Sequence, residues 1–114
     1  MKRLWSAFFN TVDGIRWAAR HETAVVQELA ALALAIPLSF FVTASAWTRV
    51  ALIGSVMLVL VVELLNTAIE KLCDHLAPEL SAQIKVVKDL GSAAVFVAIV
   101  MSAAIWLIVV VHGL

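Results

Sequence analysis

Cysteine is almost absent from this chain, because Cys73 is the only one in 114 residues. An internal disulfide is therefore excluded, and no group of cysteines and histidines has the spacing of a zinc site. We interpret Cys73 as a small apolar side chain that fills space between helices.

Glycine is also scarce. The four glycines are scattered and form no glycine-rich run: Gly14, Gly54, Gly91 and Gly113. The chain consequently lacks a phosphate-binding loop of the G-x-x-x-x-G-K-[ST] type. Three thin helices would also leave no room for a nucleotide domain. A nucleotide site in this chain would have to be of an unusual kind, formed between subunits.

Charged residues make up only 14% of the chain, whereas 64% of the residues are hydrophobic and the mean hydropathy is +1.07. These values lie far outside the range of soluble globular domains. A helix needs about 20 largely apolar residues to cross the hydrocarbon core of a membrane. Three stretches satisfy this requirement, at residues 24–42, 50–69 and 90–111. The sequence predicts an all-α membrane protein in which residues 1–114 form a single domain with three transmembrane helices.

Residues 1–21 precede the first span and are expected to form an amphipathic helix, because apolar and polar side chains recur on separate stripes at helical spacing. Such a helix lies on the membrane surface, in the interface plane. Asn10 and Asp13 interrupt the apolar stretch that a secretory signal requires, so we expect this segment to be mature sequence. The apolar stripe consists of Trp5, Phe8, Val12, Ile15 and Ala19.

The basic residues are distributed unequally along the chain. Only Arg49 falls in the short link between the first and second spans. The others precede the first span or lie between the second and third: Lys2, Arg3, Arg16, Arg20, Lys71, Lys85 and Lys88. Because cytoplasmic loops are enriched in lysine and arginine, we expect the N-terminus inside and the C-terminus outside. Residues 71–89 are expected to form the only substantial loop, with Pro78 as its clearest break and amphipathic stretches on both sides of it.

The segment VVELLNTAIEKLCD, residues 61–74, places four polar side chains at the end of the second span: Glu63, Asn66, Glu70 and Asp74. They fall within about 80° of one another on a helix. Glu63 lies about 10 Å deeper than Glu70, where an isolated carboxylate costs about 2.5–3.5 kcal/mol on insertion scales. No span carries a basic residue at comparable depth, so Glu63 is a strong functional candidate. Asn66 fits an interhelical hydrogen bond equally well.

Two further carboxylates, Glu22 and Glu28, fall at the same level of the membrane. Their separation in sequence would place them on different faces of one helix, so we expect that they do not share a partner. Several carboxylates near water suit Mg²⁺, which is usually held by one or two carboxylates together with substrate phosphates. This combination points towards a nucleotide.

Two segments resemble the signatures of the prokaryotic diacylglycerol kinase family: ELLNTAIE, residues 63–70, followed by Asp74, and KDLGSAAV, residues 88–95. The resemblance extends from about Arg3 to Val110. It implies a homotrimer in the bacterial inner membrane that transfers the γ-phosphate of MgATP to diacylglycerol and forms phosphatidic acid, with active sites between subunits. The partners implied are ATP and the lipid, and no nucleic acid.

The resemblance also implies roles for individual residues. Glu63 matches the catalytic base, which also contacts the substrate, and Asn66 matches a neighbour that positions the reacting groups. Glu22 and Glu70 match metal-binding glutamates that also contact the nucleotide. The remaining matches are nucleotide-site positions, Arg3, Thr11, Asp74, Lys88 and Asp89, and substrate-site positions, Glu28 and Ser92. The chain departs from the usual family pattern at His21 and Val26.

Three alternatives remain open at this point. Undecaprenol kinase shares the family's fold, although GSAAV after Lys88-Asp89 is more similar to the diacylglycerol branch. An ion channel or proton-coupled transporter built around Glu63 would need polar groups leading to both sides of the membrane, and few lie beyond Glu63. A purely structural membrane subunit would leave the deep carboxylate unexplained.

Overall fold

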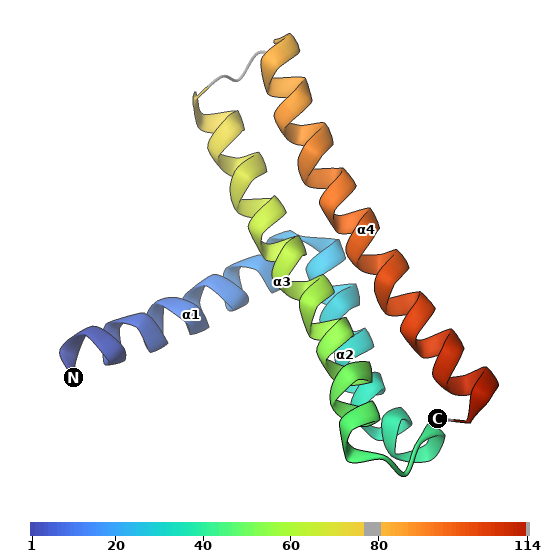
Figure 1. The fold of residues 1–114 in the computed structure, drawn as a ribbon. Coiled ribbons are helices and arrows are strands. Elements are labelled where there is room, and N and C mark those ends of the chain that lie inside the picture. Colours follow the sequence, from blue (N-terminus) through green and yellow to red (C-terminus); the bar gives the residue numbers. More distant parts are fainter. Residues whose placement is uncertain (77–80, 114) are drawn as a thin grey trace.

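A computed structural model describes residues 1–76 and 81–113, and nearly all of them are helical (Figure 1). The helices are α1 (Lys2–His21), α2 (Thr23–Val42), α3 (Ala46–Leu76) and α4 (Ala82–His112). By length and composition, α2, α3 and α4 can each cross a membrane. The predicted all-α class and the three apolar helices are therefore confirmed.

The three long helices form a bundle in which α3 packs against both α2 and α4. Neighbouring helices run antiparallel, and α1 projects sideways from the bundle (Figure 1). Glu22 makes the turn between α1 and α2, because its backbone is extended, with φ −123° and ψ 111°. Large apolar side chains on α1 are exposed, among them Trp5 and Phe8. The membrane-surface position of α1 remains a prediction.

Small and hydroxyl-bearing residues line the contact between α3 and α4. Gly91, Ala98 and Ser102 are buried on α4, and the hydroxyl oxygens of Ser102 and Ser55 lie 2.9 Å apart. Small residues allow helix backbones to approach closely within a membrane, and polar side chains then bond across the contact. The two long helices are therefore held in one register.

The prediction of a loop over residues 71–89 is wrong for most of its length. Helix α3 continues to Leu76 and α4 already begins at Ala82, while Pro78 lies outside the described residues. Ser81 caps α4, since its hydroxyl accepts a hydrogen bond from the Ile84 amide at 3.2 Å. The polar residues in this region end the apolar spans but contain no helix breaker up to Leu76. Both helices therefore extend beyond the apolar stretches and carry polar groups that face each other.

Candidate functional site

The polar extensions of α3 and α4 are joined by a direct ion pair. The Lys88 ammonium donates a hydrogen bond to Asp74 Oδ1 at 2.7 Å. Both residues lie outside the apolar stretches 50–69 and 90–111. The hydrogen bond from Lys88 lowers the pKa of the Asp74 carboxyl, and the same bond raises the pKa of the Lys88 ammonium. Two of the predicted nucleotide-site residues are thus in contact.

Asp89 does not share this contact. Its carboxylate accepts a 2.6 Å hydrogen bond from Lys85, one turn earlier on α4, and both side chains are exposed. Lys88 and Asp89 are neighbours in sequence, but a step of one residue on a helix turns the side chain by about 100°. The two residues therefore face different surroundings within the chain.

Glu63 lies deeper along α3 and is buried, with only 9% of its surface exposed. Within residues 1–76 and 81–113, no basic side chain forms an ion pair with it. Thr67, which borders the same face, is also buried. The structure thus places a carboxylate without a cationic partner inside the helical bundle, which is costly for a carboxylate that serves packing alone.

Three other carboxylates surround Glu63 closely enough to interact with it electrostatically: Glu22, Glu28 and Glu70. Both Glu22 and Glu28 lie close enough to Glu63 to interact with it, and the expectation that the two glutamates do not share a bound partner stays a prediction. Glu22 occupies the extended link between α1 and α2, so helical spacing does not describe its direction. Like charges gathered in one place repel one another, and a bound cation would relieve this repulsion.

Asn66 connects this group to the next turn of α3. Its amide Nδ2 donates a 2.8 Å hydrogen bond to Glu70 Oε1. The other end of the amide, Oδ1, is buried and has no hydrogen-bond partner among the residues that the structure describes. Asn66 thus holds one carboxylate by its nitrogen, while its buried oxygen makes no hydrogen bond to the described residues.

Lys71 was not singled out by the sequence patterns, yet it contacts the candidate site. Its ammonium lies 3.4 Å from Glu22 Oε1 and 5.4 Å from the centroid of the Trp17 ring. One signal was available in the sequence, since Lys71 follows Glu70 directly at the polar end of the span. Its partner on the link before α2 could not be inferred from that position.

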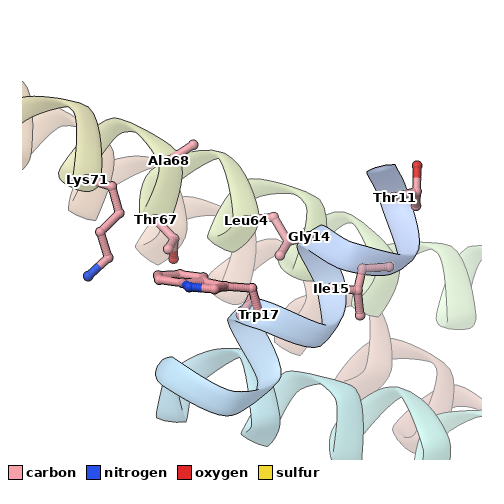
Figure 2. Close-up of a pocket in the computed structure, with 9 residues that line it drawn as sticks. Thr11, Gly14, Ile15, Trp17, Leu64, Thr67, Ala68 and Lys71 are labelled. Atoms are coloured by element: carbon pink, nitrogen blue, oxygen red, sulfur yellow. The ribbon is translucent and has the colours of Figure 1, made fainter. Parts of the chain in front are cut away.

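A groove of about 360 Å³ runs between α1 and α3 beside this contact. Figure 2 shows the Trp17 ring next to Thr67, with Lys71 at the same end of the groove. The Thr11 hydroxyl donates to Ala7 O at 2.9 Å within α1. The lining residues are Thr11, Gly14, Ile15, Trp17, Ala18, Leu64, Thr67, Ala68 and Lys71. The groove is mainly apolar, with a single cation at one end.

The remaining predicted site residues are not gathered by one chain. Arg3 is exposed in the first turn of α1, and the N-terminal end of that helix projects away from the long helices (Figure 1). Ser92 is exposed on α4. One chain therefore brings Glu22, Glu28, Glu63 and Glu70 together but leaves these two predicted site residues on its surface.

The oxygen-rich character of this cluster suits a hard divalent cation. In the described part of the chain, no three histidine, cysteine or acidic side chains are grouped closely enough to hold a metal ion by themselves. Mg²⁺ does not need such a cage, because one or two carboxylates suffice when substrate phosphates supply further oxygens. Glu22 and Glu70 supply carboxylate oxygens of this type.

Comparison with known proteins agrees with these features. Residues 10–110 match the model of the family described as prokaryotic diacylglycerol kinase. A diacylglycerol kinase of Escherichia coli K12 is 43% identical over 95 residues, which cover 83% of this chain and 78% of that protein. Relatives with the same name in Pseudomonas aeruginosa and Haemophilus influenzae are 36% and 34% identical, over 93% and 84% of this chain and 86% and 81% of their own lengths. With its three apolar helices and nearly full-length match, this chain is an enzyme that belongs to the prokaryotic diacylglycerol kinase family.

Proposed function

We propose that this chain transfers the γ-phosphate of ATP to the free hydroxyl of diacylglycerol, at the cytoplasmic face of the bacterial inner membrane, and so forms phosphatidic acid. The observation that carries the proposal is the buried Glu63 carboxylate, which has no cationic partner among the described residues. It lies on an apolar helix, where the hydroxyl of a membrane-resident lipid can reach it. The relatives named diacylglycerol kinase support this choice of lipid.

Glu63 acts as the general base in this proposal. It accepts the proton of the lipid hydroxyl while the hydroxyl oxygen forms a bond to the γ-phosphorus and the bond from that phosphorus to the β,γ-bridging oxygen breaks. ADP leaves with the electron pair of the broken bond. Such a base contributes about 10²- to 10⁴-fold to the rate, and the rest of phosphoryl transfer depends mainly on positioning and on neutralising charge.

The next turns of α3 hold the phosphates in this proposal. Asn66 fixes the Glu70 carboxylate through its 2.8 Å hydrogen bond. One further turn along, Asp74 holds the Lys88 ammonium at 2.7 Å, and this ammonium is available to attract the negative phosphate chain. The proposed site therefore extends along α3 from Glu63, on the lipid side, to the Lys88 ammonium, on the water side.

Glu22 and Glu70 would hold Mg²⁺ together with the ATP phosphates. The bound ion would neutralise charge on the phosphates. Glu22 is kept near the site by Lys71, whose ammonium lies 3.4 Å from it. Both carboxylates interact electrostatically with Glu63, so the ion would also relieve the repulsion inside the cluster.

We further infer a homotrimer with active sites shared between subunits, in which α1 lies on the membrane surface and the N-terminus is cytoplasmic. Two observations support shared sites. Arg3 and Ser92, which the family resemblance assigns to the site, are exposed outside the carboxylate cluster of their own chain. Much of the apolar surface of α2 and α4 is also exposed, so it is available to neighbouring subunits as well as to lipid.

The experiment that tests the activity compares two lipids in detergent micelles. Purified protein is incubated with ATP labelled at the γ-phosphate and either diacylglycerol or undecaprenol, and the products are separated by thin-layer chromatography. We expect labelled phosphatidic acid as the main product. Preferential labelling of undecaprenol would show that the chain belongs to the polyprenol branch, and labelling of neither lipid would overturn the proposed activity.

A further inference from the structure

Gly91 on α4 lies directly against the side chain of Asn66 on α3. A Cβ atom at position 91 would overlap Asn66 Oδ1 and lie 3.2 Å from Asn66 Cγ. We propose that Gly91 is a positioning residue that holds the Asn66 carboxamide in the orientation required for phosphoryl transfer. The kinetic part of this inference rests on the proposed role of Asn66.

The reason for a glycine at position 91 is space. Gly91 is helical and buried, and Gly113 is the only described glycine with a positive φ, so position 91 does not require glycine's backbone freedom. The other glycines differ in their surroundings, since a Cβ at Gly14, Gly54 or Gly113 would meet nothing within 4 Å. Among the four glycines, only Gly91 faces a side chain of the candidate site.

The amide of Asn66 is held at both ends. Its Nδ2 donates to Glu70 Oε1 at 2.8 Å, while its Oδ1 is directed at Gly91 and has no other partner in the described part of the chain. If the amide turned over, Oδ1 would face the Glu70 carboxylate, and two acceptors would repel each other. A side chain at position 91 would force the amide to move away from this arrangement.

The same contact also sets the register of the ion pair further along the helices. Lys88 and Gly91 are three residues apart and lie on one face of α4. Asn66, Glu70 and Asp74 follow one another at four-residue steps on the facing side of α3. If α4 were pushed away at Gly91, the Lys88 ammonium would also be displaced from its 2.7 Å contact with Asp74.

The contact can be tested by a signal that does not depend on activity. The chain contains only two asparagines, Asn10 and Asn66, so selective ¹⁵N labelling of asparagine gives two pairs of side-chain amide resonances in micelles. We expect Gly91→Ala to shift the Asn66 pair and leave the Asn10 pair in place. Gly54→Ala, the matched control, should shift neither pair. An unmoved Asn66 pair in Gly91→Ala would overturn the proposal.

The kinetic consequence is measured on the same proteins. A displacement of about 1 Å in a positioned group can cost about 10²-fold in rate, so we expect kcat of Gly91→Ala to fall by about that factor. The Mg²⁺ concentration for half-maximal activity should rise, because the displaced amide no longer holds Glu70. KM for diacylglycerol should stay within about twofold, because Asn66 does not bind the lipid in this proposal. Gly54→Ala should keep wild-type kinetics. Wild-type kcat in Gly91→Ala would contradict the positioning role.

Asn66→Ala separates the two ways in which this inference could fail. If Asn66→Ala loses kcat while Gly91→Ala retains it, the proposed role of Asn66 stands and only the positioning role of Gly91 is overturned. If Asn66→Ala retains wild-type kcat, both roles are overturned, although a shifted amide resonance would still report the contact.

A third measurement distinguishes positioning from general helix packing and covers the case in which Gly91→Ala does not fold. Tm is measured in micelles for Gly91→Ala alone and in the Asn66→Ala background. We expect the loss of Tm caused by Gly91→Ala, or its failure to fold, to be largely removed when the Asn66 side chain is absent. An equal loss in both backgrounds would show that the added methyl group clashes with something other than Asn66, and the proposal would fail.

Discussion

Lys88 on α4 donates a 2.7 Å hydrogen bond to Asp74 on α3, and this bond joins the two helices just beyond their apolar stretches. Asp74 lies on the same face of α3 as Asn66 and Glu70. The two segments that resemble the family's signatures, residues 63–70 and 88–95, therefore lie along one contact between α3 and α4.

Replacing Glu63 tests the proposed base. Glu63→Gln keeps the shape of the side chain but removes its ability to accept a proton, so we expect kcat to fall by about 10²- to 10⁴-fold. The apparent KM for MgATP should change little, because the proposed phosphate site lies further along α3. Steady-state kinetics in matched micelles provide the measurement. A variant that kept more than about a tenth of wild-type kcat would show that Glu63 is not the base.

The metal assignment is tested by Glu22→Gln and Glu70→Gln. Each change removes one charged oxygen ligand, so we expect the Mg²⁺ concentration for half-maximal activity to rise in both variants. Asp13→Asn, which alters an exposed acid on α1, serves as the control and should leave the Mg²⁺ dependence unchanged. If both glutamine variants kept the wild-type dependence, the two glutamates would not be metal ligands.

Shared active sites are tested by mixing two defective chains. Glu22 and Glu63 interact within one chain, so a more informative pair combines Glu63→Gln with Arg3→Ala, which alters an exposed residue near the free end of α1. If each variant alone is impaired, we expect co-assembled mixtures to be more active than either, because some interfaces combine two intact halves. Cross-linking verifies co-assembly. Activity that never exceeds the average of the separate variants would place the site within one chain.

The Asp74–Lys88 bond should contribute to stability in a pH-dependent way. The pKa of Asp74 is lowered in the folded chain, so its contribution is present above the unfolded pKa of about 4 and is lost as the pH falls through the lower folded value. The pKa of Lys88 is raised, so its contribution is lost only as the pH rises beyond about 10.4. We expect Asp74→Asn to lower Tm at pH 7, and the gap from wild type to close as the pH drops below about 4. A gap that did not depend on pH would contradict this account.

The predicted topology can be tested with a thiol reagent that does not cross membranes. Native Cys73 is buried, so its failure to react would not report which side it faces. We therefore expect Ala44→Cys, at an exposed position in the link between α2 and α3, to be labelled in intact cells on a Cys73→Ala background. His75→Cys, at an exposed position near the end of α3, should be labelled only after permeabilisation. The opposite pattern would reverse the orientation.

The extent of the helices could be predicted only in part. The three spans followed from apolar length, which is a local property of the sequence. The expected loop at residues 71–89 failed because polarity was taken as the end of the helix, whereas a helix continues through polar residues when no breaker interrupts its backbone hydrogen bonds. The helical turns that were expected to be loop carry Asp74 on α3 and Lys88 on α4. The mispredicted region is therefore the one that forms the ion pair.

Helical spacing was enough to predict which groups share one face of α3, because Glu63, Asn66 and Glu70 follow the period of a single helix. The sequence also indicated that Glu63 would lie in an apolar region without a basic neighbour at its depth. The contacts between different elements follow from how the helices pack: Lys88 with Asp74, Gly91 with Asn66, and Lys71 with Glu22. These contacts depend on the register between two packed helices and on the extended backbone of the α1–α2 link. Helical spacing describes neither, because it relates residues only within one continuous helix.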